Sequence, residues 1–176
     1  MKCLFLLLGL LYQFALTHAQ TKLSRNMLIK MVPLKDSASI SKEKLSNLSS
    51  TLNAAVKDRT NILIISQTLK DTKDQQVSLI AGMRRREAYK VNLPAVVSKH
   101  IGETEKNLEL LFASAASNQW ILFFDEADKL FSNSREPEST ANAIQKLSLE
   151  KKVMSIFWCE DDCLNWLGRS KYVLIE

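Results

Sequence analysis

The chain has 176 residues, of which 46% are apolar and 24% are charged, with only 4 glycines and 3 prolines. This composition excludes a disordered or collagen-like chain, and the length allows one domain of ordinary size with a short appendage. The formal net charge of +5 is too modest to indicate a nucleic-acid partner, and two histidines and three cysteines leave little room for a zinc site.

Residues 1–19 are predicted to be a secretory signal peptide. Lys2 supplies a positive start, the run from Cys3 to Leu11 is almost purely apolar, and Thr17-His18-Ala19 provides a small-x-small cleavage site. The apolar run is too short to cross a bilayer comfortably, so we expect no stable membrane span after cleavage. We therefore expect an exported protein, periplasmic or secreted. A buried N-terminal helix or an uncleaved anchor is the alternative for this segment, and a cytoplasmic location is the alternative for the protein.

The cysteines do not decide the compartment. Cys159 and Cys163 remain after removal of the leader. Their spacing of four residues allows a disulfide if both lie on one helical turn, and two free thiols are an equal alternative.

Residues 20–58 are predicted to form a mobile N-terminal segment followed by a leading helix. Residues 21–40 have no steady periodicity and run into a serine-rich stretch. From 41 to 58, apolar residues recur at helical spacing, at Leu45, Leu48, Leu52 and Val56.

From residue 59 to residue 176, short apolar runs alternate with helical patterns. Strands are predicted at 61–66, 89–93, 120–124, 153–158 and 172–175, and helices at 74–86, 103–116 and 138–149. Strands that alternate with helices indicate a parallel sheet covered on both faces. The predicted fold is therefore a three-layer α/β sandwich with a five-stranded, mostly parallel sheet, whose ligands bind at the carboxyl ends of the strands.

The strand at 120–124 is followed directly by acidic residues. The strand would hold Asp125 rigidly at the sheet edge, where a carboxylate can bind Mg²⁺ through its water shell. Glu126 would face the same crevice and could polarise a water for attack on a γ-phosphate. On its own the pattern is weak, because acidic residues after a strand also cap helices.

Three further segments surround this acidic pair or contain it: Ser98 to Leu108 (SKHIGETEKNL), Leu111-Phe112, and Ile121 to Phe131 (ILFFDEADKLF). Their order and spacing over about 90–131 resemble the core of the AAA-family ATPases. The resemblance implies a P-loop NTPase-like fold with ATP and Mg²⁺ as cofactors, Asp125 on the metal and Glu126 as the catalytic base. It also implies rings of identical subunits that act on a protein client. The sequence ends at Glu176, so we expect the fold without the family's helical lid.

The same resemblance, extended upstream, places Lys73 at the P-loop lysine, with Thr72 and Lys70 as further phosphate contacts. The family's loop is rich in glycine, which lets backbone N–H groups wrap the phosphates closely. Residues 66–74 contain no glycine, and Asp74 stands where the family has a hydroxyl for Mg²⁺. A solvated polar loop without a phosphate site is the alternative.

The resemblance implies two further sites. His100, Ile101 and Gly102 match the pore loop that grips substrate polypeptide, with histidine in place of the aromatic residue. Arg169 falls near the family's arginine finger, although a plain surface charge is the alternative. The strand at 153–158 ends in Trp158, where the family usually ends in a polar sensor residue, so we expect that sensor to be absent.

Three functional hypotheses follow. The first is an AAA-type ATPase-like domain with weak or no ATP hydrolysis, which forms homo-oligomers. The second is a catalytically dead, AAA-derived module, a pseudo-ATPase, that acts by binding another protein. The third is a truncated copy without function. Export favours the second, because ATP is scarce outside the cytoplasm. The first two hypotheses predict a protein client or partner and no nucleic acid.

Overall fold

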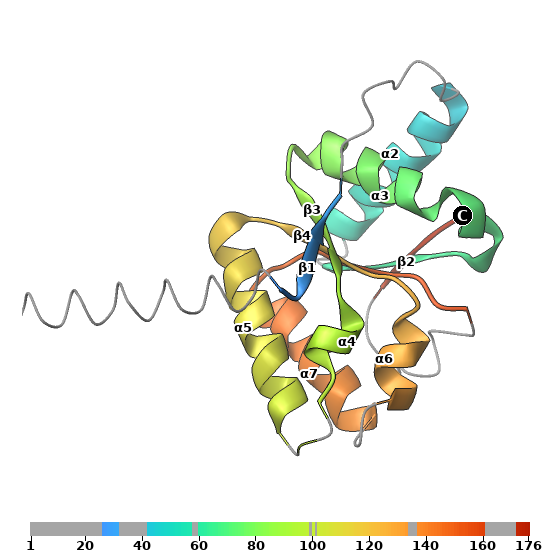
Figure 1. The fold of residues 1–176 in the computed structure, drawn as a ribbon. Coiled ribbons are helices and arrows are strands. Elements are labelled where there is room, and N and C mark those ends of the chain that lie inside the picture. The colour runs from blue at the N-terminus through green and yellow to red at the C-terminus, as the bar shows by residue number, and fades with distance from the viewer. Residues whose placement is uncertain are drawn as a thin grey trace, which may run out of the picture.

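The computed structural model describes residues 26–31, 42–57, 60–98, 100, 102–133, 137–160 and 172–176. They form one sheet of six strands with helices on both faces (Figure 1). The strands are β1 (Leu28–Lys30), β2 (Ile62–Ile65), β3 (Ala88–Val91), β4 (Ile121–Phe124), β5 (Ser155–Phe157) and β6 (Val173–Ile175). The predicted leader, Ile101, Cys163 and Arg169 lie outside the described residues.

The strand order is β1-β3-β4-β5-β2-β6, and the five strands from β2 to β6 are all parallel to one another. The prediction of a mostly parallel α/β sheet is therefore confirmed. The sixth strand, β1, pairs antiparallel with β3. The expectation of a mobile segment over 21–40 is wrong for Leu28–Lys30. A three-residue edge strand with one face in solvent is too short to produce a readable period.

The helices divide into two layers. They are α2 (Lys42–Lys57), α3 (Lys73–Arg84), α4 (Leu93–Val96), α5 (Glu103–Asn118), α6 (Ala127–Asn133) and α7 (Pro137–Glu150), with a 3-10 helix, η2 (Gln67–Thr72), before α3. Figure 1 shows α2 and α3 on one face of the sheet and α4, α5, α6 and α7 on the other. None of these described helices is long and apolar enough to span a bilayer.

Successive side chains of a strand point to opposite faces of the sheet, so each buried strand contributes to both layers of the core. Ile62 and Ile64 pack into the cluster that contains α5 and α7, whereas Leu63 and Ile65 pack into the cluster that contains α2 and α3. The rings of Phe124 and Phe157 stack across β4 and β5 with centroids 4.8 Å apart. Burial of each such side chain contributes roughly 1.5–3 kcal/mol. This packing holds the carboxyl ends of β2, β4 and β5 at one edge.

Candidate functional site

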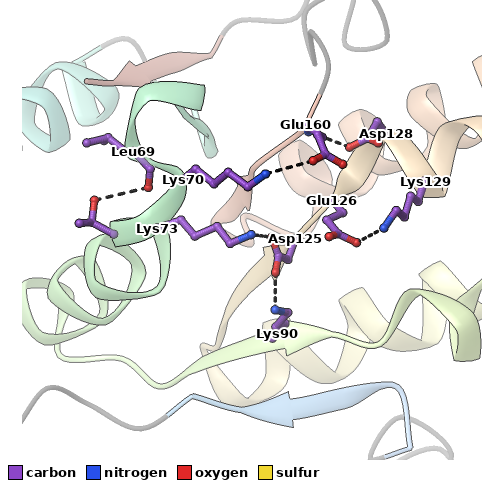
Figure 2. A network of polar contacts seen from close by, with 10 residues as sticks. Leu69, Lys70, Lys73, Lys90, Asp125, Glu126, Asp128, Lys129 and Glu160 are labelled. Carbon is purple, nitrogen blue, oxygen red and sulfur yellow. Dashed lines mark hydrogen bonds and ion pairs between the residues drawn. The ribbon is translucent and has the colours of Figure 1, made fainter.

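Four side chains meet at the carboxyl edge of the sheet. Asp125 directly follows β4 and Trp158 directly follows β5, while Lys90 lies on the neighbouring strand β3 and Lys73 is the first residue of α3. Figure 2 shows Lys73 reaching Asp125 from one side and Lys90 reaching it from β3. The structure therefore brings together two of the predicted site residues, Asp125 and Lys73.

The Asp125 carboxylate is held between two ammonium groups. Lys73 Nζ lies 2.7 Å from Oδ1, and Lys90 Nζ donates to Oδ2. The carboxylate is buried, with a side-chain exposure of 8%, and Lys73 is 17% exposed. Burial raises the pKa of Asp125, but the Lys73 and Lys90 ammonium groups lower it by more, so this pKa lies below its ordinary value. Asp125 is therefore ionised and internally neutralised.

Trp158 closes the other side of the Lys73 ammonium group. Its indole is 2% exposed, and Lys73 Nζ lies 3.7 Å from the ring centroid. An ammonium group over an indole face is attracted by the ring quadrupole, by about 2 kcal/mol when the pair is desolvated. The cation of Lys73 is thus shared between a carboxylate and an aromatic face. Trp158 stands at the strand end where the resemblance implied a polar sensor.

The loop before α3 is a 3-10 helix that bonds to the rest of the chain. Ser66 caps η2 by accepting from the Thr68 N–H, and Thr72 Oγ1 donates to the Leu69 carbonyl at 3.4 Å. Lys70 Nζ lies 3.1 Å from Glu160 Oε1. Lys70 and Thr72, the two predicted phosphate contacts besides Lys73, are therefore directed to groups of the protein itself.

Glu126 lines the same cavity as Asp125, but its carboxylate is bonded to a lysine of α6 and not to the Asp125 site. It has a left-handed backbone conformation, with φ 52°, and its carboxylate accepts from Lys129 of α6, as Figure 2 shows. The hydrogen bond to Glu126 is the main cause that raises the pKa of Lys129. The next acidic residue, Asp128, accepts from the Glu160 N–H at 3.0 Å. The predicted base is thus tied to an exposed lysine at the rim of the site.

Comparison with known sequences agrees with this architecture. Residues 73–156 match the sequence model of the ATPase family associated with various cellular activities, AAA. A proteasome-associated ATPase of Acidothermus cellulolyticus is 31% identical over 75 residues, and that of Geodermatophilus obscurus is 29% identical over 75 residues. Each match covers 39% of this chain and 13% of the relative. The chain contains an AAA-type core domain.

Solved structures of low sequence identity share the fold of this AAA-type core. The Hsp104–ADP complex of S. cerevisiae has a TM-score of 0.60 at 15% identity, over 86% of this chain and 30% of that chain. A closed-state reconstruction of Hsp104 with ATPγS and FITC-casein has a TM-score of 0.59 at 13% identity, over 88% of this chain and 30% of that chain. Among the described residues of this chain, no helical lid accompanies the core.

The AAA family binds ATP with Mg²⁺, and the residues present here do not fit that pair of ligands. A metal ion at Asp125 would have to displace two ammonium groups from one buried carboxylate. The N–H of Leu69, which a phosphate-binding loop would leave free, donates to the Ser66 carbonyl. The family match itself begins at Lys73, so residues 66–72 of the glycine-free segment lie before it.

The predicted pore-loop residues lie on a different part of the AAA core. His100 and Gly102 are exposed on the turn that leads into α5. Gly102 has φ 76° and its carbonyl accepts from the Lys106 N–H at 3.2 Å, so this glycine begins the helix in a left-handed conformation. Ile101 of the pore loop and Arg169, the predicted arginine finger, lie outside the described residues.

Sequence reasoning missed Lys90 as a member of the site. Lys90 is aligned with Phe123 in the pairing of β3 with β4, so it lies two residues before the level of Asp125 on the adjacent strand. A charged residue inside a predicted buried strand was the available signal. Sequence alone did not show that β3 and β4 are neighbours.

Cys159 is disulfide-bonded. Of the two alternatives for this residue, the free thiol is therefore excluded. Cys159 is buried in the same core cluster as α5 and α7. The other cysteines of the chain, Cys3 and Cys163, lie outside the described residues.

Proposed function

We propose that this chain is an AAA-type module that does not turn over ATP and that works by binding another protein. The observation that carries the proposal is the state of Asp125, whose two oxygens face Lys73 and Lys90. The residue that would hold Mg²⁺ and the residue that would hold phosphate neutralise each other.

Nucleotide binding would have to break the contacts that Asp125 and Lys73 make in this structure. Removing one partner from a buried ion pair costs about 3–5 kcal/mol, because the other charge stays buried without compensation. Metal binding at Asp125 would separate it from Lys73 and Lys90, and Lys73 would also leave the Trp158 ring. New contacts with phosphate would have to offset these losses in a loop that has no glycine.

A protein partner is the favoured ligand because the departures from the family pattern are concentrated at the nucleotide edge, whereas the sheet and its core are intact. Both core clusters are continuous, and the strands that build the AAA sheet are all present. Among proteins with this fold, one Hsp104 structure was determined with FITC-casein. These observations support a scaffold retained for binding a polypeptide.

We also propose that the protein is exported and that cleavage follows Ala19. The apolar leader pattern supports this proposal. The disulfide at Cys159 supports it as well, because disulfides persist mainly in oxidising compartments. An ATP-independent module is consistent with a compartment in which ATP is scarce.

The test is a set of Mg-ATP and ADP titrations by calorimetry, with phosphate release measured in parallel. The proteins are the full chain, Lys90→Met and, as a lysine control far from Asp125, Lys146→Met. We expect no binding by the full chain at millimolar nucleotide and no phosphate release by any of the three proteins. Lys90→Met frees one oxygen of Asp125, so weak binding by this variant alone would agree with the proposal.

A single result would overturn the proposal. This result is ATP turnover by the full chain, on the order of one per second as in ordinary enzymes, that is abolished by Glu126→Gln. It would show that Asp125 and Lys73 separate when nucleotide binds. Near-UV circular dichroism of each variant establishes that a negative result comes from a folded protein.

A further inference from the structure

A cavity of about 350 Å³ lies at the opposite end of the sheet from Asp125. It is placed between the end of α3, the start of β3 and the edge strand β1, which Figure 1 shows close together. Ala88, the first residue of β3, is aligned with Ile121, the first residue of β4. The cavity is therefore at the amino ends of the strands and is separate from the nucleotide edge of the AAA core.

Small and apolar residues form much of the wall of this cavity, and basic residues lie at its rim. Ala81, Gly82 and Ala88 contribute to the walls, with Met31 beside them. A Cβ added at Gly82 would meet no atom within 4 Å, so the cavity is open at that position. The volume lies within the range of small-molecule sites, roughly 300–1,000 Å³.

The charges at the rim do not cancel. Lys30 and Glu87 form an ion pair, and Glu87 Oε2 also accepts from the Tyr89 hydroxyl at 3.0 Å. Arg85 and Arg86 are both exposed at the cavity, and neither guanidinium has a partner among the described residues. Two uncompensated positive charges therefore face one apolar cavity.

The backbone that carries the two arginines is held in place. The Arg85 N–H donates to the Gly82 carbonyl at 3.1 Å, and the Arg86 N–H donates to the Ala81 carbonyl at 3.0 Å. These bonds end α3 with Arg85 in a left-handed conformation, φ 53°. The helix end thereby sets the backbone positions from which both side chains extend.

We propose that this cavity binds a phosphate monoester with an apolar body. A monoester carries a charge of about −1.5 to −2 near neutral pH, which matches the two free arginines. The guanidinium fork donates two parallel hydrogen bonds to phosphate, and the small apolar walls accept the body of the ester. The same chemistry is offered by a soluble phosphate ester and by a phospholipid headgroup. The proposal does not rest on the proposed function, because the two sites are at opposite ends of the sheet.

The test uses the full chain with two probes. One probe is phenyl phosphate, followed by NMR titration, and the other is vesicles of phosphatidylcholine with and without phosphatidic acid. The test variant is Arg85→Gly and the matched control is Lys152→Gly. Both residues are exposed, have left-handed backbones with φ 53° and 54°, and carry one positive charge. Because glycine favours this conformation, neither change should lower stability.

We expect Arg85→Gly and Arg86→Ala each to weaken phenyl phosphate binding about tenfold, as loss of a charge-assisted hydrogen bond predicts. Lys152→Gly should change it less than about twofold, because Lys152 is not among the residues that line the cavity and exposed charges are screened by salt. Binding of phenyl phosphate without vesicle binding would identify a soluble ester, and arginine-dependent binding to phosphatidic acid vesicles would identify a headgroup. Equal weakening by Lys152→Gly, or no binding of either probe at about 10 mM, would overturn the proposal.

Discussion

At the scale of single residues, the behaviour of the site depends on Asp125. A carboxylate at 8% side-chain exposure is stable as an anion only with compensation, and two lysines supply it. Glu126, the next residue, has a half-exposed carboxylate whose partner is an exposed lysine. Two adjacent acidic residues therefore have different physical roles. Asp125 is bound into the structure, and Glu126 lies at the rim.

This difference predicts unequal effects of two isosteric changes. Asp125→Asn should lower the free energy of unfolding by about 3 kcal/mol near pH 7, because Lys73 and Lys90 would remain with no anion between them. Glu126→Gln, the matched control, should change the free energy of unfolding little. Urea denaturation of the two variants and the full chain measures both effects.

The same pair of variants predicts a pH dependence. The pKa of Asp125 is lower in the folded than in the unfolded chain, so its contribution is complete above an unfolded pKa of about 4 and is lost as the pH falls below that value. The stability difference between the full chain and Asp125→Asn should therefore shrink between about pH 5 and pH 3. A difference that stays constant over this range would contradict the role of Asp125 as a buried anion.

At the scale of elements, α2 is the helix whose role the structure changes most. Its sequence placed it in a leading segment before the core. In the structure, Leu48 and Leu52 are buried in one cluster with Leu63 and Ile65 of β2. Arg84 of α3 also donates to the Leu52 carbonyl at 2.9 Å. The helix therefore covers one face of the sheet and contributes to its core.

We expect Leu52→Ala to lower the free energy of unfolding by about 2–5 kcal/mol, because it leaves a cavity against β2. Asn53→Ala is the control on the same helix. Asn53 is exposed and alanine favours helix, so this change should leave stability equal or slightly higher. Thermal and urea unfolding measure both. If Leu52→Ala unfolds like the full chain, α2 is not part of the cooperative unit.

At the scale of the whole molecule, the sheet order separates two sites. Neighbouring parallel strands bring Lys90 of β3 and Asp125 after β4 together at the carboxyl edge, although they are 35 residues apart in sequence. The chain from α3 to β3 brings Arg85 and Arg86 to the amino edge. At the carboxyl edge, where the AAA family binds nucleotide, Asp125 is thus paired with two lysines, and at the opposite edge two arginines line a cavity.

The export proposal is also tested on the whole molecule. Expression in a host with its secretion system intact should yield a protein that begins at Gln20 in the exported fraction, with Cys159 oxidised. Intact mass before and after reduction and alkylation measures both properties. Recovery of the uncleaved chain from the cytoplasm, with Cys159 alkylated without prior reduction, would contradict export.

The sequence by itself determined the order of the main elements, the mostly parallel sheet, the AAA resemblance and the acidic pair after β4. These follow from local periodicity and from residues adjacent in the chain, which a linear reading can detect. Only the tertiary structure decided that Asp125 is neutralised by Lys73 and Lys90 and that Trp158 covers Lys73. It also decided that Leu28–Lys30 joins the sheet and that two arginines face a cavity. Each of these contacts depends on which distant segments become neighbours and on how much water remains between them. Local sequence patterns determine neither property.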